Sequence, residues 1–201
     1  MKTINNKIQK LKEVRELLIT IDMVNGFVKE GALAAPSIMR VVPRQIELLN
    51  QALNQDDIGI IFIRDSHTKN ATEFKTYGEH CLKETKETEV IDELKEFEKI
   101  GITYFKNSTN LIFAPKFQED LLKLYKLERI RLMGCLSEVC VMNGAIGLRT
   151  FLDEVNRDVE VCVHADTIDT FNAPGHAADE VTKEAINRMQ ANGIKILGKR
   201  M

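Results

Sequence analysis

The chain has 201 residues, of which 44% are hydrophobic and 29% charged, and its formal net charge is −2 at pH 7. These values exclude a disordered chain, which would need lower hydrophobicity or a larger net charge. The near-neutral charge gives no electrostatic footprint for nucleic acid or for an anionic membrane surface, so neither is expected as a partner. The length is typical of one domain, which we expect to span residues 1–201.

Six short apolar runs predict β-strands, and most are continuously apolar, as in parallel strands covered on both faces. They lie at 16–22, 58–65, 102–106, 129–134, 159–166 and 194–198. Segments with helical spacing lie between them, at 37–54, 89–99, 117–126, 138–156 and 176–192. The amphipathic stretch 3–14 favours a further helix, as an N-terminal extension over residues 1–15. This alternation predicts a three-layer α/β/α fold with a mainly parallel, six-stranded, Rossmann-like sheet.

The sequence also indicates the cellular compartment in which the protein is expected. No apolar run approaches the ~20 residues that cross a bilayer, and the first residues, MKTINNKIQKLKEV, have no apolar signal-peptide core. The four cysteines form no CxxC pair, which disfavours a zinc ribbon or a thioredoxin motif. We therefore expect a cytoplasmic protein without a disulfide framework and without a membrane partner.

Three reactive side chains follow three different predicted strands. Asp22 ends the first, Lys106 ends the third, and Cys140 lies just inside the helix after the fourth. A thiol near a helix N-terminus has a lowered pKa, and the free N–H groups there can stabilise an oxyanion. Asp22 could accept the thiol proton and later protonate a leaving amine, with Lys106 holding it ionised.

Each of these residues also has a structural interpretation. Cys140 could be a small core residue, and Asp22 could cap the turn after its strand. Lys106 could be a solvated surface charge, and Ser137 could cap the helix that carries Cys140. The convergence of three reactive residue types on one edge of the sheet favours the catalytic interpretation.

A second cluster lies in DSHTKNATEFKTYGEHC. Asp65 and His67 are two residues apart, so their side chains leave an extended segment on the same side. His80 follows, with Glu73 between. Carboxylate and neutral imidazole ligands suit Zn²⁺, Fe²⁺ or Mn²⁺, although a polar surface loop would have the same composition. The adjacent Cys81 is an alternative to His80, which we favour because it completes an Asp/His/His set without a thiolate.

The remaining histidines favour structural roles. His164 lies in an apolar strand and is expected in the core, whereas His176, near a helix start, either lines the pocket or caps the helix. No GxGxxG or GxxxxGK[ST] phosphate loop is present in the sequence, which argues against a nucleotide enzyme.

Taken together, these residues resemble the isochorismatase-like cysteine hydrolases over residues 16–197, and most closely the nicotinamidase/pyrazinamidase branch. The resemblance implies a catalytic triad of Asp22 in IDMVNGF, Lys106 in YFKNSTN and Cys140 in GCLSEVCV. It also implies a cis peptide bond between Cys135 and Leu136, and an oxyanion hole made by the N–H groups of Leu136 and Cys140.

The resemblance further implies a divalent metal ion, with Zn²⁺ the first choice and Fe²⁺ or Mn²⁺ the others. Its ligands would be Asp65, His67 and His80, with Glu73 as an optional fourth. Phe27 and Tyr104 are expected to line the substrate pocket. The sequence departs from the family's usual D-W-H motif, because Ser66 occupies the position of the aromatic residue between Asp65 and His67. The chain contains no Trp.

The implied activity is hydrolysis of nicotinamide, or a similar small aromatic carboxamide, to the acid and ammonia through a thioester, with a role in NAD salvage. An amidase acting on another amide or ureido compound is the alternative, and a non-catalytic binding module is a second. Relatives are often dimers or tetramers, so a homo-oligomer is expected.

Overall fold

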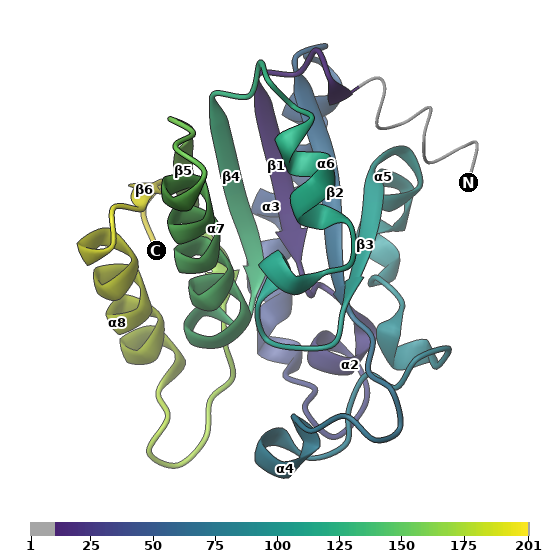
Figure 1. Ribbon diagram of the computed structural model, residues 1–201. Coiled ribbons are helices and arrows are strands. Elements are labelled where there is room, and N and C mark those ends of the chain that lie inside the picture. Colours follow the sequence, from purple (N-terminus) through teal and green to yellow (C-terminus); the bar gives the residue numbers. More distant parts are fainter. Residues whose placement is uncertain (1–10, 201) are drawn as a thin grey trace.

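The computed structural model describes residues 11–200 and contains one six-stranded sheet in which every neighbouring pair of strands is parallel (Figure 1). The strands are β1 (Glu16–Ile21), β2 (Ile58–Asp65), β3 (Ile102–Lys106), β4 (Arg129–Cys135), β5 (Glu160–Asp169) and β6 (Lys195–Leu197). Their order is β3-β2-β1-β4-β5-β6. The predicted α/β fold and all six predicted strands are confirmed. The predicted helix over 3–14 falls largely outside the described residues.

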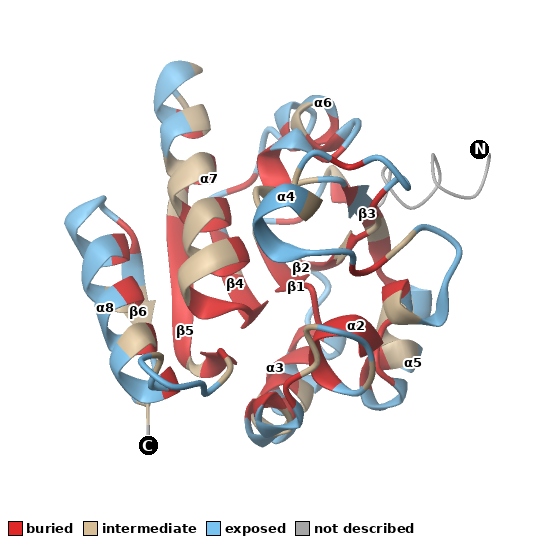
Figure 2. Cartoon of the chain, turned by 90° about the horizontal axis from the view of Figure 1, so that it is seen from below, coloured by how far each residue is buried: buried red, intermediate tan, exposed pale blue. Residues whose placement is uncertain are grey.

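The two faces of the sheet bury two separate apolar clusters. Leu17, Ile19 and Ile21 of β1 join one cluster, which lies beneath the helices α6 (Phe117–Leu122), α7 (Met142–Glu154) and α8 (Ala178–Ala191). Leu18 joins the other cluster, which lies beneath α2 (Asn25–Val28), α3 (Val42–Leu53) and α5 (Lys95–Ile100). Successive side chains of a strand point to opposite faces, so a strand covered on both sides must be apolar at every position. Figure 2, which looks onto the edge where the strands end, shows the buried strands between helices with exposed outer faces.

The helices differ from the sequence prediction mainly at their ends. Those expected from the sequence are α3 (Val42–Leu53), α5 (Lys95–Ile100), α6 (Phe117–Leu122), α7 (Met142–Glu154) and α8 (Ala178–Ala191). Turns of 3₁₀ helix precede α3 and α5, at Pro36–Val41 and Asp92–Leu94, and a π-helical turn, Ser137–Val141, precedes α7. Two helices were not predicted, α2 (Asn25–Val28) and α4 (Phe74–Tyr77), because four residues are too few to show a helical period.

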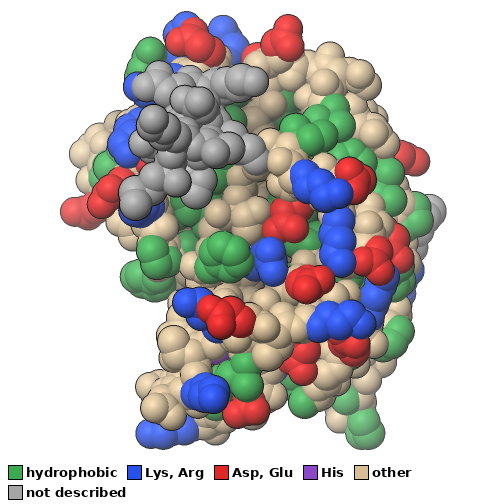
Figure 3. Space-filling model, turned by 90° about the vertical axis from the view of Figure 1, so that its right-hand side faces the viewer, with side chains coloured by type: hydrophobic (Ala, Val, Ile, Leu, Met, Phe, Trp, Pro, Cys, Tyr) green, Lys and Arg blue, Asp and Glu red, His purple; other side chains and the backbone are tan. Residues whose placement is uncertain are grey.

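Surface charge of both signs is mixed on the side of the molecule that carries β3 and α5 (Figure 3). Ion pairs such as Arg64–Glu98, at 2.9 Å, and Lys95–Asp92, at 2.8 Å, contribute to this pattern. Within residues 11–200, no helix combines the length and apolar character needed to span a bilayer.

The order of the strands determines where a ligand can bind. The chain runs outward from β1 through β2 to β3, then returns to β4 on the other side of β1 and continues outward to β6. In such a sheet the ligand crevice lies beyond the carboxyl ends of the strands where the direction reverses. Here those strands are β1 and β4, which lead directly to Asp22 and to the turn that carries Cys140.

A glycine allows β4 to approach β1 at this crossing. Gly134 has φ +132°, and a Cβ atom at this position would lie 2.0 Å from the carbonyl oxygen of Ile21. We expect Gly134→Ala to lower the free energy of unfolding by about 3–5 kcal/mol, because both the backbone conformation and the clash must be relieved.

Urea denaturation followed by circular dichroism measures this loss. Gly175→Ala is the matched control, because Gly175 also has a positive φ of 76°, but a Cβ atom at this position would meet no neighbouring group within 4 Å. It should cost only about 1–2 kcal/mol. Equal losses in the two variants would show that the close approach of β4 to β1 is unimportant.

Candidate active site

The structure brings the three predicted catalytic residues together around a buried lysine. The Nζ atom of Lys106 lies 2.8 Å from Oδ2 of Asp22, 2.8 Å from Oδ1 of Asp65 and 3.6 Å from Sγ of Cys140. All four residues are buried. Lys106 is therefore not a solvated surface charge, and it links the predicted triad to the predicted metal ligands.

Strand register explains this convergence. Asp65 is the direct partner of Lys106 at the ends of β2 and β3, and Ile21 lies beside Ile63 on one side and Gly134 on the other. Asp22 follows β1 in a left-handed conformation, with φ 53°. Because parallel strands end at the same edge of a sheet, residues far apart in the sequence meet there.

The two carboxyl groups in this cluster have opposite pKa shifts. Burial raises the pKa of Asp22 to about 6, although the attraction of Lys106 opposes this shift. Burial acts in the same direction on Asp65, but Lys106, His67 and His80 outweigh it and hold the pKa of Asp65 below its ordinary value. Asp65 is therefore ionised at neutral pH, whereas Asp22 can exchange a proton near neutral pH.

The environment of Cys140 differs from the one expected from the sequence. Burial raises the pKa of this thiol well above its ordinary value; Lys106 opposes the shift, while the nearby Asp22 and Asp65 carboxylates reinforce it. The expectation of a lowered pKa is therefore wrong. Cys140 lies within the π-helical turn that precedes α7, and one ammonium group faces two carboxylates. The thiol must lose its proton to a base, and Asp22, which contacts the same Lys106 ammonium group, is the candidate.

The turn that carries Cys140 is fixed by a hydrogen bond to α8 and not by a side-chain cap. The hydroxyl group of Ser137 lies 2.6 Å from that of Thr182 in α8, and no side chain caps the start of the turn. The interpretation of Ser137 as an N-cap is wrong. The peptide bond between Cys135 and Leu136 is cis, as the family resemblance implies. The oxyanion hole at the N–H groups of Leu136 and Cys140 stays a prediction.

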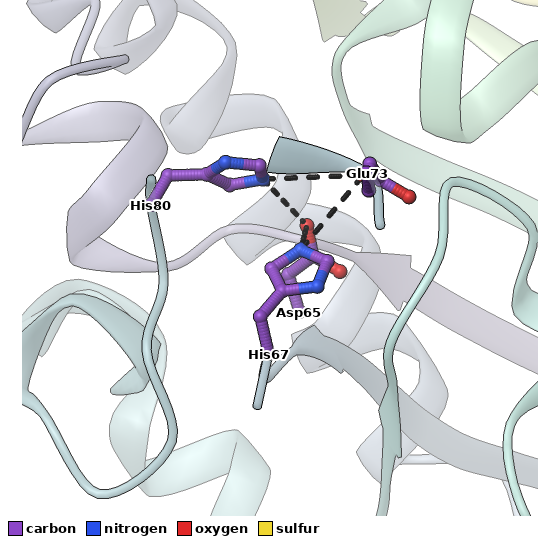
Figure 4. Close-up of side chains that lie close together, drawn as sticks. All are labelled: Asp65, His67, Glu73 and His80. Atoms are coloured by element: carbon purple, nitrogen blue, oxygen red, sulfur yellow. Dashed lines mark ion pairs between the residues drawn. The ribbon is translucent and has the colours of Figure 1, made fainter. Parts of the chain in front are cut away.

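The predicted metal ligands form a compact group (Figure 4). One ligand atom from each of Asp65, His67, Glu73 and His80 lies within 4.8 Å of the others. The Nε2 atoms of His67 and His80 lie 3.1 Å and 3.5 Å from Oδ2 of Asp65, and 3.8 Å and 4.0 Å from Oε1 of Glu73. Glu73 reaches the group because it directly precedes the unpredicted helix α4.

The surroundings of this group suit a metal ion. The Nδ1 atoms of His67 and His80 lie 3.1 Å from Oδ1 of Asn107 and 2.9 Å from the Gly78 carbonyl oxygen, leaving both Nε2 atoms directed at the carboxylates. Oδ2 of Asp65 and Nε2 of His67 are buried and lack a hydrogen-bond partner among residues 11–200. Two imidazoles and two carboxylates match Zn²⁺, Fe²⁺ or Mn²⁺. The Cys81 thiol points elsewhere, 3.9 Å from the Glu87 carbonyl oxygen.

A small pocket of about 30 Å³ joins Cys140 to the metal-ligand group. Phe27 lines it as predicted, and its ring lies 5.5 Å from that of His80. Tyr104 does not line it: this side chain packs against Phe117 and its hydroxyl group donates a hydrogen bond to Asp120, on the face covered by α6. Tyr77, which was not predicted from the sequence, lines the pocket from the end of α4.

The other two histidines lie outside the metal-ligand group. His164 is buried, as expected for a core histidine, and burial lowers its pKa to about 4. The ring of His176 stacks on Phe171 at 4.0 Å between centroids, and its Nε2 lies 3.1 Å from Glu138. His176 lines a larger cavity beside the site, so the interpretation as a pocket residue holds for that cavity.

The fold and site define a doubly wound, parallel α/β protein with a buried cysteine at the strand ends. Comparison with known proteins identifies the family, because the model of the Isochorismatase domain matches residues 16–199. This chain therefore belongs to the isochorismatase family.

Individual relatives are distant. The uncharacterized isochorismatase family protein PncA of Bacillus subtilis (strain 168) is 23% identical over 173 residues, which cover 82% of this chain and 91% of that protein. The structure of the pyrazinamidase of Pyrococcus horikoshii in complex with zinc matches with a TM-score of 0.72 and 22% identity, covering 92% of this chain and 99% of that one. The N-carbamoylsarcosine amidase of Thermoplasma acidophilum matches with a TM-score of 0.70 and 21% identity, covering 93% and 96%. At these identities the structures show a common fold.

Proposed function

We propose that this protein is a metal-containing cysteine amidohydrolase that converts nicotinamide, or a similar small aromatic carboxamide, to the acid and ammonia. The observation that carries the proposal is the contact of Lys106 with both Asp22 and Cys140, next to a histidine and carboxylate group fit for a metal ion. A base, a nucleophile and a metal-ligand set around one pocket are the parts that such a reaction needs.

The reaction begins with proton transfer from the Cys140 thiol to Asp22, and the thiolate attacks the amide carbon. The N–H groups of Leu136 and Cys140 hold the oxyanion. Asp22 then protonates the amide nitrogen, the C–N bond breaks and ammonia leaves, with a thioester on Cys140. Water transfers a proton to Asp22 and attacks the thioester; the C–S bond breaks, and Asp22 returns the proton to sulfur.

Lys106 stays protonated throughout this cycle, because the two neighbouring carboxylates raise its pKa despite its burial. It offsets the charge of the Asp22 carboxylate and of the Cys140 thiolate as they form. Asp65, His67, His80 and Glu73 would hold the metal ion, which when bound supplies a Lewis acid that orients the ring of the substrate.

Metal removal provides the first test. We expect ammonia release from nicotinamide by the purified protein to disappear after chelation and to return when Zn²⁺, Fe²⁺ or Mn²⁺ is restored. His80→Ala should lower bound metal, measured by elemental analysis, by at least about tenfold, because a direct ligand is lost. His164→Ala is the control, since His164 is also buried but lies outside the group. No ammonia from reduced, metal-loaded protein would rule out nicotinamide.

The pH dependence tests the assignment of the base. Because burial raises the pKa of Asp22 to about 6, we expect kcat/KM to rise with pH through a midpoint near 6, as Asp22 becomes ionised.

The same pKa shift makes the stability of the fold depend on pH. Folding raises the pKa of Asp22 from 3.8, so the Asp22 contribution to the free energy of unfolding is present below about pH 4 and is lost as the pH rises through 6. In urea unfolding, the Asp22→Asn protein should not show this loss of stability between about pH 4 and 6. A kcat/KM that is flat between about pH 5 and 7 would contradict the assignment of Asp22 as the base.

A second candidate is an amidase of the same fold that acts on another amide or ureido compound. Ser66 favours it, because this position lacks the aromatic side chain usual in the nicotinamidase branch. Full activity on such a compound after complete metal removal would support this candidate.

A further inference from the structure

A second cavity opens directly beside the small catalytic pocket. This outer chamber has a volume of about 830 Å³ and is bounded by the segments 32–37 and 171–176 and by the turn that carries Cys140. Both segments project from the edge where the strands end, at the bottom of Figure 1, one before α3 and the other before α8. A cavity of this size is within the range that holds a complete small-molecule ligand.

The outer chamber adjoins the catalytic pocket. Both cavities are lined by Leu33, Tyr77, Leu136 and Val139, so a substrate that extends from Cys140 past these side chains enters the chamber. The catalytic pocket, at about 30 Å³, has room for only a few water-sized groups, since one water needs about 10–15 Å³ by the same kind of measure. It can hold the reacting end of a substrate beside the metal-ligand group, whereas a longer acyl part must extend into the chamber.

The residues that line the chamber indicate which kind of substrate extension fits it. Most are apolar, and the ring of Phe171, stacked parallel to His176 with an interplanar angle of 1°, adds a flat aromatic surface. The only acidic side chain among the described lining residues, Glu138, already accepts a hydrogen bond from the Thr170 hydroxyl group at 2.9 Å and lies 3.1 Å from Nε2 of His176. An anionic group would face this carboxylate, whereas an apolar group would displace water from apolar walls.

We propose that the preferred substrate is a primary carboxamide whose acyl part carries an uncharged, apolar extension larger than one ring, and that this extension occupies the outer chamber. The inference rests on the proposed amidase activity. Since that reaction releases ammonia, the extension belongs to the acyl part and not to the leaving group. Nicotinamide is then a minimal substrate that leaves the chamber largely filled with water.

A homologous series of linear primary amides, from propanamide to octanamide, tests the proposal with the full-length, metal-loaded protein. Ammonia release should show kcat/KM rising about three- to fourfold for each methylene group buried in the chamber, or about 30- to 60-fold over three such groups. The kcat/KM of a two-ring aryl carboxamide should likewise exceed the kcat/KM of its one-ring counterpart.

Filling the chamber should remove this preference. Ala32 is exposed and lines the chamber, so Ala32→Trp should lower the ratio of octanamide to propanamide kcat/KM at least tenfold. Ser37→Trp provides a second variant at another exposed lining position, should the first fail to fold. Ala191→Trp is the matched control, because Ala191 is exposed at the opposite end of α8 and lies outside the chamber lining. It should keep the wild-type ratio.

The outcomes separate this inference from the proposed function. Hydrolysis of short amides with no gain from longer ones would overturn the inference and leave the amidase in place. If no amide releases ammonia, the proposed function fails. The dissociation constants of octanamide and propanamide, measured with the Cys140→Ala protein, then decide whether the chamber binds apolar chains. Equal constants would overturn the inference. A dimer that Ala32→Trp converts to a monomer, without a change in selectivity, would also overturn it by assigning the chamber to a second copy of the chain.

Discussion

Cys140→Ala is expected to lower kcat for amide hydrolysis by about four to six orders of magnitude while leaving the fold intact. The sulfur atom is the only atom at this position that can form the thioester, and neither Asp22 nor Lys106 can replace it as a nucleophile. The side chain is small, and its loss removes no charge from the cluster, so stability should change by only about 1–2 kcal/mol.

Two measurements together test this expectation. Steady-state ammonia release reports the loss of turnover, and mass spectrometry of the wild-type protein, quenched during turnover, should show the acyl adduct on the peptide that contains Cys140. Cys162→Ala is the matched control, because Cys162 is equally buried but lies within β5. A Cys140→Ala protein that retains more than about one per cent of the activity would refute the nucleophile assignment.

Lys106→Met is expected to lower the free energy of unfolding by about 3–5 kcal/mol at neutral pH, and to abolish turnover. The substitution keeps much of the length of the side chain but removes its charge. Asp22 and Asp65 would then face each other in the interior without the ammonium group that lies 2.8 Å from each. Breaking a buried ion pair by removing one partner leaves an uncompensated charge, which is why the expected loss is large.

The double variant Asp22→Asn/Lys106→Met distinguishes this explanation from a simple packing defect. Removing one carboxylate relieves the repulsion, so the double variant should regain more than half of the lost stability in urea unfolding with chelator present. Lys195→Met is the control, since Lys195 is exposed and pairs with Glu160 at the surface, where such pairs contribute about 0–1 kcal/mol. A loss below about 1 kcal/mol in Lys106→Met would show that the buried charges are stabilised by other groups.

Much of the fold and of the candidate site is readable from the sequence because it depends on local pattern and on chain direction. Strands buried on both faces are apolar at nearly every position, as in β1 and β2, and the alternation with helices determines a parallel sheet. The ends of parallel strands share one edge, so the sequence is enough to predict that Asp22, Asp65 and Lys106 meet there.

Other features depend on contacts between distant segments, which a pattern along one segment cannot contain. Tyr104 lies two residues before the end of β3, about 7 Å back along the strand, and therefore packs under α6 rather than at the pocket, which Tyr77 lines instead. The pKa of Cys140 rises because burial and two carboxylates from other strands act on it, whereas its position near a helix start alone predicts the opposite.

The sequence by itself therefore determined the α/β fold and which residue types converge at the strand ends, because periodicity and strand direction are properties of the chain. Only the tertiary structure decided the charge balance around Lys106 and the place of Glu73 beside the two histidines. It alone also revealed the chamber next to Cys140. These features arise from distances between segments far apart in the chain, and Coulombic interaction, desolvation and cavity shape all depend on such distances.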